Sequence, residues 1–120
     1  MTYVDAFVAA VPTNNKEAYL RHAEIAADVF KEFGALQIAE CWGDDVPKGE
    51  VTDFYGAVQA KDDESIVFSW ITWPDKATRD NAMSKVMEDP RMQETDAAMP
   101  FDGSRMLLGG FDMIYQRGIT

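Results

Sequence analysis

Only one histidine and one cysteine occur among the 120 residues, so the side chains that most often carry nucleophilic chemistry are scarce. Cys41 precedes a tryptophan at the end of an expected strand. A nucleophilic cysteine needs a neighbouring base or a helix N-terminus, and His22 is the only imidazole that could serve. His22 falls at the edge of a helical apolar stripe, where it either contacts a ligand or hydrogen-bonds a neighbour. We interpret Cys41 as a packed small residue and keep both interpretations of His22.

Four acidic residues gather in a short stretch, and their spacing argues against a metal site. Asp44 and Asp45 are adjacent, with Glu50 and Asp53 nearby. A calcium loop needs acidic residues at alternating positions followed by a glycine, and this stretch lacks that pattern. One cysteine and one histidine cannot build a tetrahedral zinc site of nitrogen and sulfur ligands. We therefore expect carboxylates that accept backbone N–H bonds in turns, and no bound metal.

Tryptophans and isolated charges supply the remaining candidates for a ligand site. The three tryptophans could line a pocket for a planar ligand, or they could pack in the core or in a dimer interface. Arg105 lies at the start of the last expected strand, and Asp5 interrupts an apolar strand. Such charges either orient a polar substrate group or form a salt bridge, with Arg79 as the expected partner of Asp5. The candidate ligand-binding residues are Asp5, His22, Trp42, Trp70, Trp73 and Arg105, and no catalytic residue is assigned.

Hydrophobic periodicity predicts four strands and two main helices that position these residues. Alternation indicates strands, spacings of three and four residues indicate helices, and Pro, Gly and Asn mark the ends. The expected strands are 3–11, 35–43, 65–73 and 105–116, and the expected helices run from about 15 to 33 and from about 76 to 88. Residues 52–60 suit either a helical turn or a strand, and a short further helix begins at Pro90. The βαββαβ order predicts an α+β, ferredoxin-like fold, an antiparallel sheet with two main helices on one face.

Both faces of the predicted sheet carry large apolar side chains. Phe7 and Tyr3 share one side of the first strand, whereas Phe68 and Trp70 share a side of the third strand, opposite Trp73. Helices can cover only one face, so we expect the other face to pack against a partner. Two copies joined sheet to sheet are the simplest solution, which predicts a homodimer. Because the third strand has neighbours on both sides, we also expect the Trp70 ring to be buried.

Length, composition and net charge limit the class of protein to which this chain can belong. A chain of 120 residues with 47% hydrophobic residues suits a single domain spanning residues 1–120. Acidic side chains outnumber basic ones by 21 to 11, and the net charge of −10 argues against nucleic-acid and anionic-membrane partners. The sequence has neither a membrane-length apolar run nor a signal-peptide pattern, and a single cysteine excludes an internal disulfide. We therefore expect a soluble, cytoplasmic protein.

Several ordered motifs resemble those of one bacterial family. They are Cys41-Trp42-Gly43-Asp44-Asp45-Val46-Pro47, Val67-Phe68-Ser69-Trp70-Ile71 with Trp73-Pro74, Asp89-Pro90-Arg91-Met92, and Met99-Pro100-Phe101-Asp102-Gly103 with Arg105-Met106. Over nearly the whole chain, the sequence resembles the YbaA-like family of uncharacterised bacterial proteins. That family is similar in fold to the dimeric α/β-barrel superfamily, which includes cofactor-free antibiotic-biosynthesis monooxygenases and haem-degrading oxygenases. The resemblance implies the fold and a homodimer, and it implies no particular activity.

Three functions remain open after this resemblance, the third being that of a haem-binding relative. The first is the binding of a small apolar or aromatic ligand inside the barrel. The second is a cofactor-free, monooxygenase-like enzyme acting on an aromatic substrate, which rests on analogy with the superfamily. In related haem-degrading oxygenases a helical histidine can ligate iron, which would be the corresponding role for His22. The acidic surface would repel haem propionates, so we expect no bound cofactor.

Overall fold

The computed structural model describes residues 2–92 and 99–118 and contains the predicted order of elements. The strands are β1 (Tyr3–Pro12), β2 (Gln37–Trp42), β3 (Glu64–Trp73) and β4 (Leu107–Asp112). The helices are α1 (Lys16–Glu32), α2 (Phe54–Ala57) and α3 (Lys76–Glu88), with short 3-10 turns η1 (Thr13–Asn15) and η2 (Gly103–Arg105). Within the described ranges, no helix is both long and apolar enough to cross a membrane.

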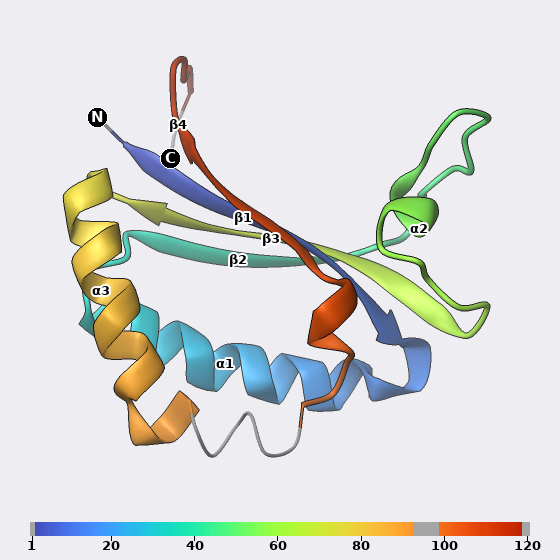
Figure 1. Ribbon diagram of the computed structural model, residues 1–120, viewed down its shortest axis with the longest axis horizontal. Coiled ribbons are helices and arrows are strands. Elements are labelled where there is room, and N and C mark those ends of the chain that lie inside the picture. The colour runs from blue at the N-terminus through green and yellow to red at the C-terminus, as the bar shows by residue number, and fades with distance from the viewer. Residues whose placement is uncertain (1, 93–98, 119–120) are drawn as a thin grey trace.

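The four strands form one antiparallel sheet in the order β2-β3-β1-β4. As the sequence predicted, β3 is a central strand. The edge strands are β2 and β4. Figure 1 shows α1 and α3 on the same side of the sheet, whereas α2 and its loops extend from the far end of β2 and β3. This arrangement confirms the α+β, ferredoxin-like fold.

Local sequence sets the ends of the helices. Gly34 follows α1 with a φ of 116°, a left-handed conformation that glycine adopts without strain. The Asp75 side chain caps α3 by accepting a hydrogen bond from the backbone N–H of Thr78 at 2.7 Å. Asp53 caps α2 in the same way, accepting from the N–H of Gly56 at 2.6 Å. This cap resolves the ambiguous segment 52–60 in favour of a helical turn.

The last strand is shorter than predicted. It covers Leu107–Asp112 rather than 105–116, because residues 103–105 form η2 and the chain leaves the sheet after 112. A β-carbon at Gly110 would collide with the hydroxyl of Tyr3 and the guanidinium of Arg79. The close backbone approach expected at this glycine pair is therefore present at Gly110. A helical turn begins at Pro90, as predicted, and its course after residue 92 lies outside the described residues.

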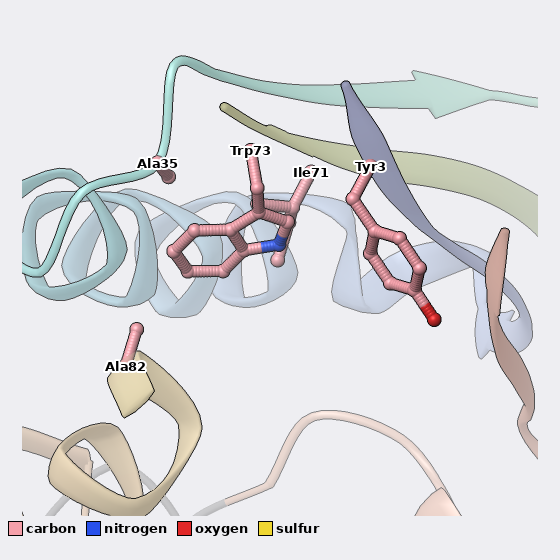
Figure 2. Packing of buried hydrophobic residues seen from close by; sticks show 5 residues of the cluster. All are labelled: Tyr3, Ala35, Ile71, Trp73 and Ala82. Carbon is pink, nitrogen blue, oxygen red and sulfur yellow. The ribbon is translucent and has the colours of Figure 1, made fainter. Parts of the chain in front are cut away.

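The core lies between the helices and the sheet. Trp73 is fully buried and packs with Tyr3 and Ile71 from the sheet, with Ala35, and with Ala82 of α3 (Figure 2). A second cluster joins α1 to the sheet and consists of Ala9, Val11, Tyr19, Ala23 and Val67. The loss of a buried aromatic side chain such as Trp73 costs about 3–5 kcal/mol of stability.

The sheet face opposite α1 and α3 is only partly covered. At one end, Val58 from the α2 segment packs against Ala10 and Ile66. Elsewhere Phe68 is 39%, Leu107 46% and Phe111 58% exposed. Trp70 is half-buried on this face, so one chain alone does not give its ring the expected full burial. We call the side chains aligned here by strand pairing the open face: Val4, Val8, Phe68, Trp70, Leu107 and Phe111.

Candidate functional site

A cavity of about 220 Å³ lies between α1 and the sheet. On α1 it is lined by three alanines at helical spacing, whose small side chains leave the space unfilled: Ala23, Ala26 and Ala27. Most of the other walls are apolar or aromatic and include Phe7, Phe30, Ile38, Ile71, Phe101 and Met106. Four polar side chains also face the space: Tyr19, His22, Glu40 and Ser69. We call this space the inner cavity.

A short hydrogen bond joins two of the polar groups. The phenol of Tyr19, from α1, donates to Oε1 of Glu40, from β2, at 2.7 Å. Burial, followed by the hydrogen bond and charge of Glu40, raises the pKa of Tyr19 well above its usual range, so the phenol stays protonated. Burial also raises the pKa of Glu40, against hydrogen bonds from Tyr19 and Ser69 that lower it. Because β2 is an edge strand and Glu40 is exposed, its carboxyl can exchange protons with solvent.

His22 lines the inner cavity from α1, and Nδ1 of its imidazole is buried. The ring lies edge-on to Phe101 with centroids 6.2 Å apart, and Tyr19 contacts the same phenyl ring at 5.6 Å. Cys41 is different: it is exposed on β2, paired in register with Phe68, and it does not line the inner cavity. Within one chain the expectation that Cys41 is packed is therefore wrong, because this edge strand leaves its side chain uncovered beside Phe68.

A second hollow, of about 140 Å³, shares Tyr19 and Glu40 with the inner cavity. Its other lining residues are Lys16, Leu20, Cys41, Trp42 and Val67. Nζ of Lys16 lies 5.4 Å from the centroid of the Trp42 ring, within cation–π range. Because the Tyr19–Glu40 pair lines both hollows, it forms their common wall. We call this second hollow the outer groove.

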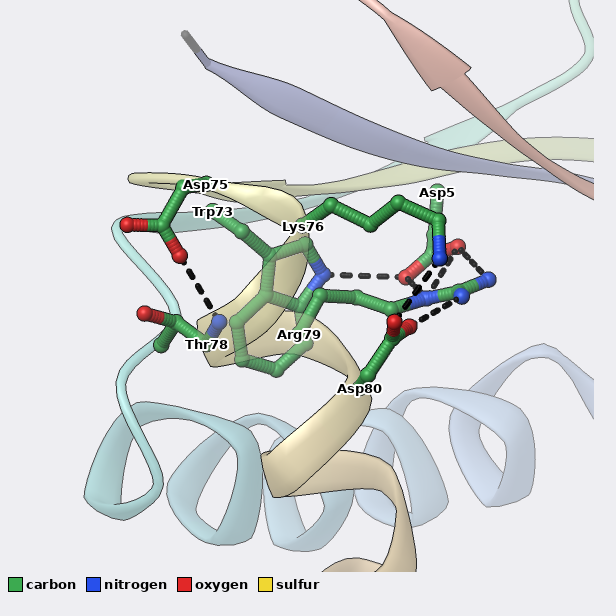
Figure 3. Close-up of polar contacts among 7 residues, drawn as sticks. All are labelled: Asp5, Trp73, Asp75, Lys76, Thr78, Arg79 and Asp80. Atoms are coloured by element: carbon green, nitrogen blue, oxygen red, sulfur yellow. Dashed lines mark hydrogen bonds and ion pairs between the residues drawn. The ribbon is translucent and has the colours of Figure 1, made fainter.

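The carboxylate of Asp5 accepts hydrogen bonds from other side chains in a buried cluster (Figure 3). It accepts a hydrogen bond from Nε1 of Trp73 at 2.9 Å and one from Nη2 of Arg79 at 2.8 Å. Arg79 also pairs with Asp80 at 2.9 Å, and its guanidinium lies 5.2 Å from the centroid of the Tyr3 ring. The salt bridge that the sequence suggested between Asp5 and Arg79 is therefore present within one chain.

The guanidinium of Arg105 likewise donates hydrogen bonds to other groups of the protein. Its Nη1 and Nη2 each donate to one carboxylate oxygen of Glu64 at 2.7 Å, and its Nε donates to Asp102 at 3.1 Å. Nη1 also donates to the carbonyl of Gln59 at 2.8 Å. The Arg105 hydrogen bonds outweigh burial and hold the pKa of Glu64 at about 2. Arg105 thus ties η2 to the start of β3 and lies outside the inner cavity.

The three tryptophans occupy three different environments. Trp73 is in the core, Trp42 lines the outer groove, and Trp70 lies on the open face, where its Nε1 donates to Gln37 at 3.3 Å. They therefore do not form one aromatic pocket. Of the candidate ligand-binding residues, the structure brings only His22 and Trp42 next to the Tyr19–Glu40 pair.

Sequence reasoning did not single out Tyr19, Glu40 or Ser69. Tyr19 fits the apolar stripe of α1, so the pattern accounts for it as a packing residue and does not indicate a role for its phenol. The usable signal is Glu40, because alternation places it on the same strand face as Ile38 and Trp42. A carboxylate on the helix-facing side of a strand needs a hydrogen-bonding partner, and a tyrosine on the facing helix can supply one.

Residues 2–92 and 99–118 contain no group of three or more His, Cys, Asp or Glu side chains placed to hold a metal ion. In the acidic stretch, Asp53 accepts hydrogen bonds from the backbone N–H groups of Gly49 at 3.1 Å and Gly56 at 2.6 Å. The turn role that the sequence predicted is therefore confirmed for this carboxylate.

Solved structures share this fold at low sequence identity. An uncharacterized NIPSNAP-like domain protein from Burkholderia xenovorans aligns with a TM-score of 0.62 and 13% identity, covering 99% of this chain and 91% of that one. A putative antibiotic biosynthesis monooxygenase from Nitrosomonas europaea gives 0.57 and 12%, with 98% and 94% covered. A mutant of SnoaB, a cofactor-independent oxygenase from Streptomyces nogalater, gives 0.52 and 16%, with 96% and 93% covered. At such identities the likeness concerns the fold alone.

Sequence comparison gives a closer relationship. The uncharacterized protein YbaA of Escherichia coli strain K12 is 58% identical over 114 residues, which cover 95% of this chain and 97% of that protein. YbaA of Shigella flexneri matches to the same extent. The family model described as "Protein of unknown function (DUF1428)" matches residues 2–103. The YbaA-like resemblance is therefore confirmed, and the chain belongs to the DUF1428 family of proteins of unknown function.

Proposed function

We propose that this protein binds a small, mainly apolar ligand carrying a hydroxyl or N–H group, and that the ligand occupies the inner cavity. The observation that carries the proposal is the Tyr19–Glu40 hydrogen bond, at one wall of a cavity lined otherwise mainly by apolar and aromatic side chains. Ligand sites characteristically combine apolar walls with a few polar groups that fix orientation. Three phenylalanines in the walls favour a flat aromatic ring, because rings stack or meet edge to face.

The polar wall favours a ligand that donates a hydrogen bond. The single O–H of Tyr19 is already directed at Glu40, and Ser69 also hydrogen-bonds this carboxyl. A carboxylate offers about four lone-pair positions, so Glu40 keeps acceptor capacity after these two bonds. A phenol or an N–H group can use that capacity, whereas an ether oxygen cannot. The site should therefore distinguish a hydroxyl from a methoxy group on the same ring.

Calorimetric titration with 2-naphthol and with 2-methoxynaphthalene tests this distinction. A hydrogen bond to a charged group contributes about 1.5–3 kcal/mol, so 2-naphthol should bind about tenfold more tightly or better. Glu40→Gln keeps the shape of the side chain but removes its charge, and it should bring 2-naphthol close to the affinity of the methoxy compound. Glu24→Gln, on the exposed side of α1, is the matched control and should leave both affinities unchanged.

A cavity-filling variant tests the location of the ligand. Ala26 faces the inner cavity from α1, so Ala26→Leu should occupy part of the space and weaken both compounds. Equal binding to wild type and Ala26→Leu would place the ligand elsewhere and contradict the proposal. Circular dichroism and the denaturation midpoint of the variant show that any loss of binding does not come from unfolding.

The raised pKa of Glu40 favours a second candidate, a cofactor-free oxygenase acting on an aromatic substrate. A carboxylate in an apolar cavity is a stronger base than one in water, and two of the fold relatives bear monooxygenase or oxygenase names. In this reaction Glu40 removes a proton from a ring CH2 group and the resulting carbanion adds O2. Loss of one water then leaves a carbonyl in place of the CH2 group.

Oxygen uptake with anthrone tests this candidate, because one O2 is consumed for each anthraquinone and water formed. Wild type should raise the rate above that of the uncatalysed reaction, and Glu40→Gln should remove the increase. A rate equal to the uncatalysed one contradicts the oxygenase candidate, and it does not affect the proposal of ligand binding.

We further propose that the protein is a cytoplasmic homodimer joined through the open face. One chain leaves Phe68, Leu107 and Phe111 well exposed beside a half-buried Trp70. A contiguous apolar sheet surface of this kind is typical of an interface, and a symmetric pair of identical faces covers it with a single contact. The cytoplasmic location is supported by the single cysteine, which can form no internal disulfide and so suits a reducing compartment.

A further inference from the structure

The outer groove adjoins the proposed ligand site directly. The Tyr19–Glu40 pair lines both the groove and the inner cavity, and the groove continues from this pair toward Lys16 and Trp42. Its remaining walls are formed by Leu20, Val67 and Cys41. A ligand whose donor group reaches Glu40 from the inner cavity therefore has the groove immediately beyond that group.

Lys16 gives the groove a charge that the inner cavity lacks. The inner cavity has no lysine or arginine among its lining residues, whereas Lys16 lines the outer groove. No carboxylate within residues 2–92 and 99–118 lies within 4.0 Å of its ammonium, whereas Arg79, Arg91 and Arg105 all have carboxylate partners. Most lysines in the described part of the chain share this feature, since Lys76 alone among them has a carboxylate partner, so Lys16 is distinguished by its position in the groove beside Trp42.

We propose that the outer groove is a second subsite, which binds an anionic substituent of the ligand through Lys16. The inference rests on the proposed function and extends it: the ligand is an apolar or aromatic acid whose donor group meets Glu40 and whose carboxylate or similar anion meets Lys16. An ammonium that lies beside a ring and has no carboxylate partner can form a charge-assisted hydrogen bond without first breaking an ion pair.

A cationic substituent fits the groove less well. The ammonium of Lys16 already lies over the Trp42 ring, so a second cation there would meet a like charge. Glu40 does not prevent anion binding, because Tyr19 donates a hydrogen bond to its carboxylate and Ser69 hydrogen-bonds it as well. The groove therefore selects for negative charge, although the protein as a whole is acidic.

Two matched probes test this subsite: 3-(2-hydroxyphenyl)propanoate and its amide, which have the same shape and differ in charge. Chemical-shift titration by NMR gives both affinities. Wild type should bind the acid about three- to tenfold more tightly than the amide, in keeping with a partly accessible ion pair, and high salt should reduce the difference. In Lys16→Met the apolar stem remains over Trp42, and the preference for the acid should vanish while the affinity for the amide stays the same.

Lys31→Met is the control, because Lys31 lies on the same helix and its ammonium bonds the carbonyl of Leu36 far from the groove. The control should keep the preference for the acid. If Lys16→Met also keeps it, or if wild type binds acid and amide equally, the subsite is overturned. Failure of 2-naphthol to bind wild type overturns the proposed function and this inference together. Binding of 2-naphthol without any preference for the acid overturns this inference alone.

Discussion

The ion pair between Arg105 and Glu64 should make the protein sensitive to acid. The side chains are 14% and 4% exposed, and two hydrogen bonds of 2.7 Å join them. These bonds lower the pKa of Glu64 from 4.5 to about 2 in the folded protein. Because the folded pKa is depressed, the stabilisation is complete above the unfolded value of 4.5 and is lost as the pH falls from 4.5 toward 2. The shift corresponds to about 3 kcal/mol at neutral pH.

Replacing Arg105 should show how much its ion pair with Glu64 contributes to the free energy of unfolding. Arg105→Met leaves a buried carboxylate without its partner, which costs about 3–5 kcal/mol when a buried pair is broken. Urea denaturation at neutral pH, followed by tryptophan fluorescence, should show that loss, and the variant should lose less further stability than wild type between pH 4.5 and 2. The double variant Glu64→Gln with Arg105→Met should recover part of the stability lost at neutral pH, because no buried charge remains.

Arg21→Met, on the exposed surface of α1, is the control and should leave the free energy of unfolding unchanged within about 0.5 kcal/mol. If Arg105→Met has the stability of wild type at neutral pH, the ion pair does not stabilise the fold. Arg105 would then be available to a ligand, as the sequence-based candidate list allowed.

Three further predictions concern the site, the core and the open face. The pKa of Glu40 is raised in the folded state, so the stability of wild type falls as the pH rises from the unfolded value of 4.5 to the folded pKa, and the stability of Glu40→Gln relative to wild type should increase from pH 4 to pH 7 in urea denaturation. Asp5→Ala leaves the buried groups of Arg79 and Trp73 without their acceptor and should destabilise by about 3–5 kcal/mol, whereas Asp5→Asn, which can still accept from the Trp73 indole, should cost less in thermal melts. Sedimentation equilibrium at micromolar concentration should give twice the 13.4 kDa chain mass for wild type and a monomer for Phe68→Glu; a monomeric wild type would refute the open-face interface.

The sequence predicted the fold well because the relevant signals are local. Alternation along β1 and β3, the proline after β3 and the glycine after α1 mark elements and their ends without reference to the rest of the chain. The partnership of Asp5 and Arg79 was also predictable, since a charge on an apolar strand requires a counter-charge. The bounds of β4 were not predictable from the sequence, because a glycine pair and alternating apolar residues give no local reason for the chain to leave the sheet after Asp112.

The candidate site was predicted only in part. His22 and Trp42 adjoin it, but the pairing of Tyr19 with Glu40 depends on how α1 lies across β2, and periodicity does not report that angle. The inner cavity itself follows from three alanines facing the sheet, and a run of small residues on a helix predicts close packing as readily as empty space. Volume between elements is a property of the assembled fold, so the sequence alone could not supply it.

A crystal structure of the protein with 2-naphthol tests the central claim most directly, because it shows where the ligand lies and what its oxygen contacts. The naphthyl ring should lie between α1 and the sheet, against Phe101, with its hydroxyl within hydrogen-bonding distance of Glu40. An inner cavity without ring density after co-crystallisation at saturating 2-naphthol, or a ring bound on the open face instead, would contradict the proposal.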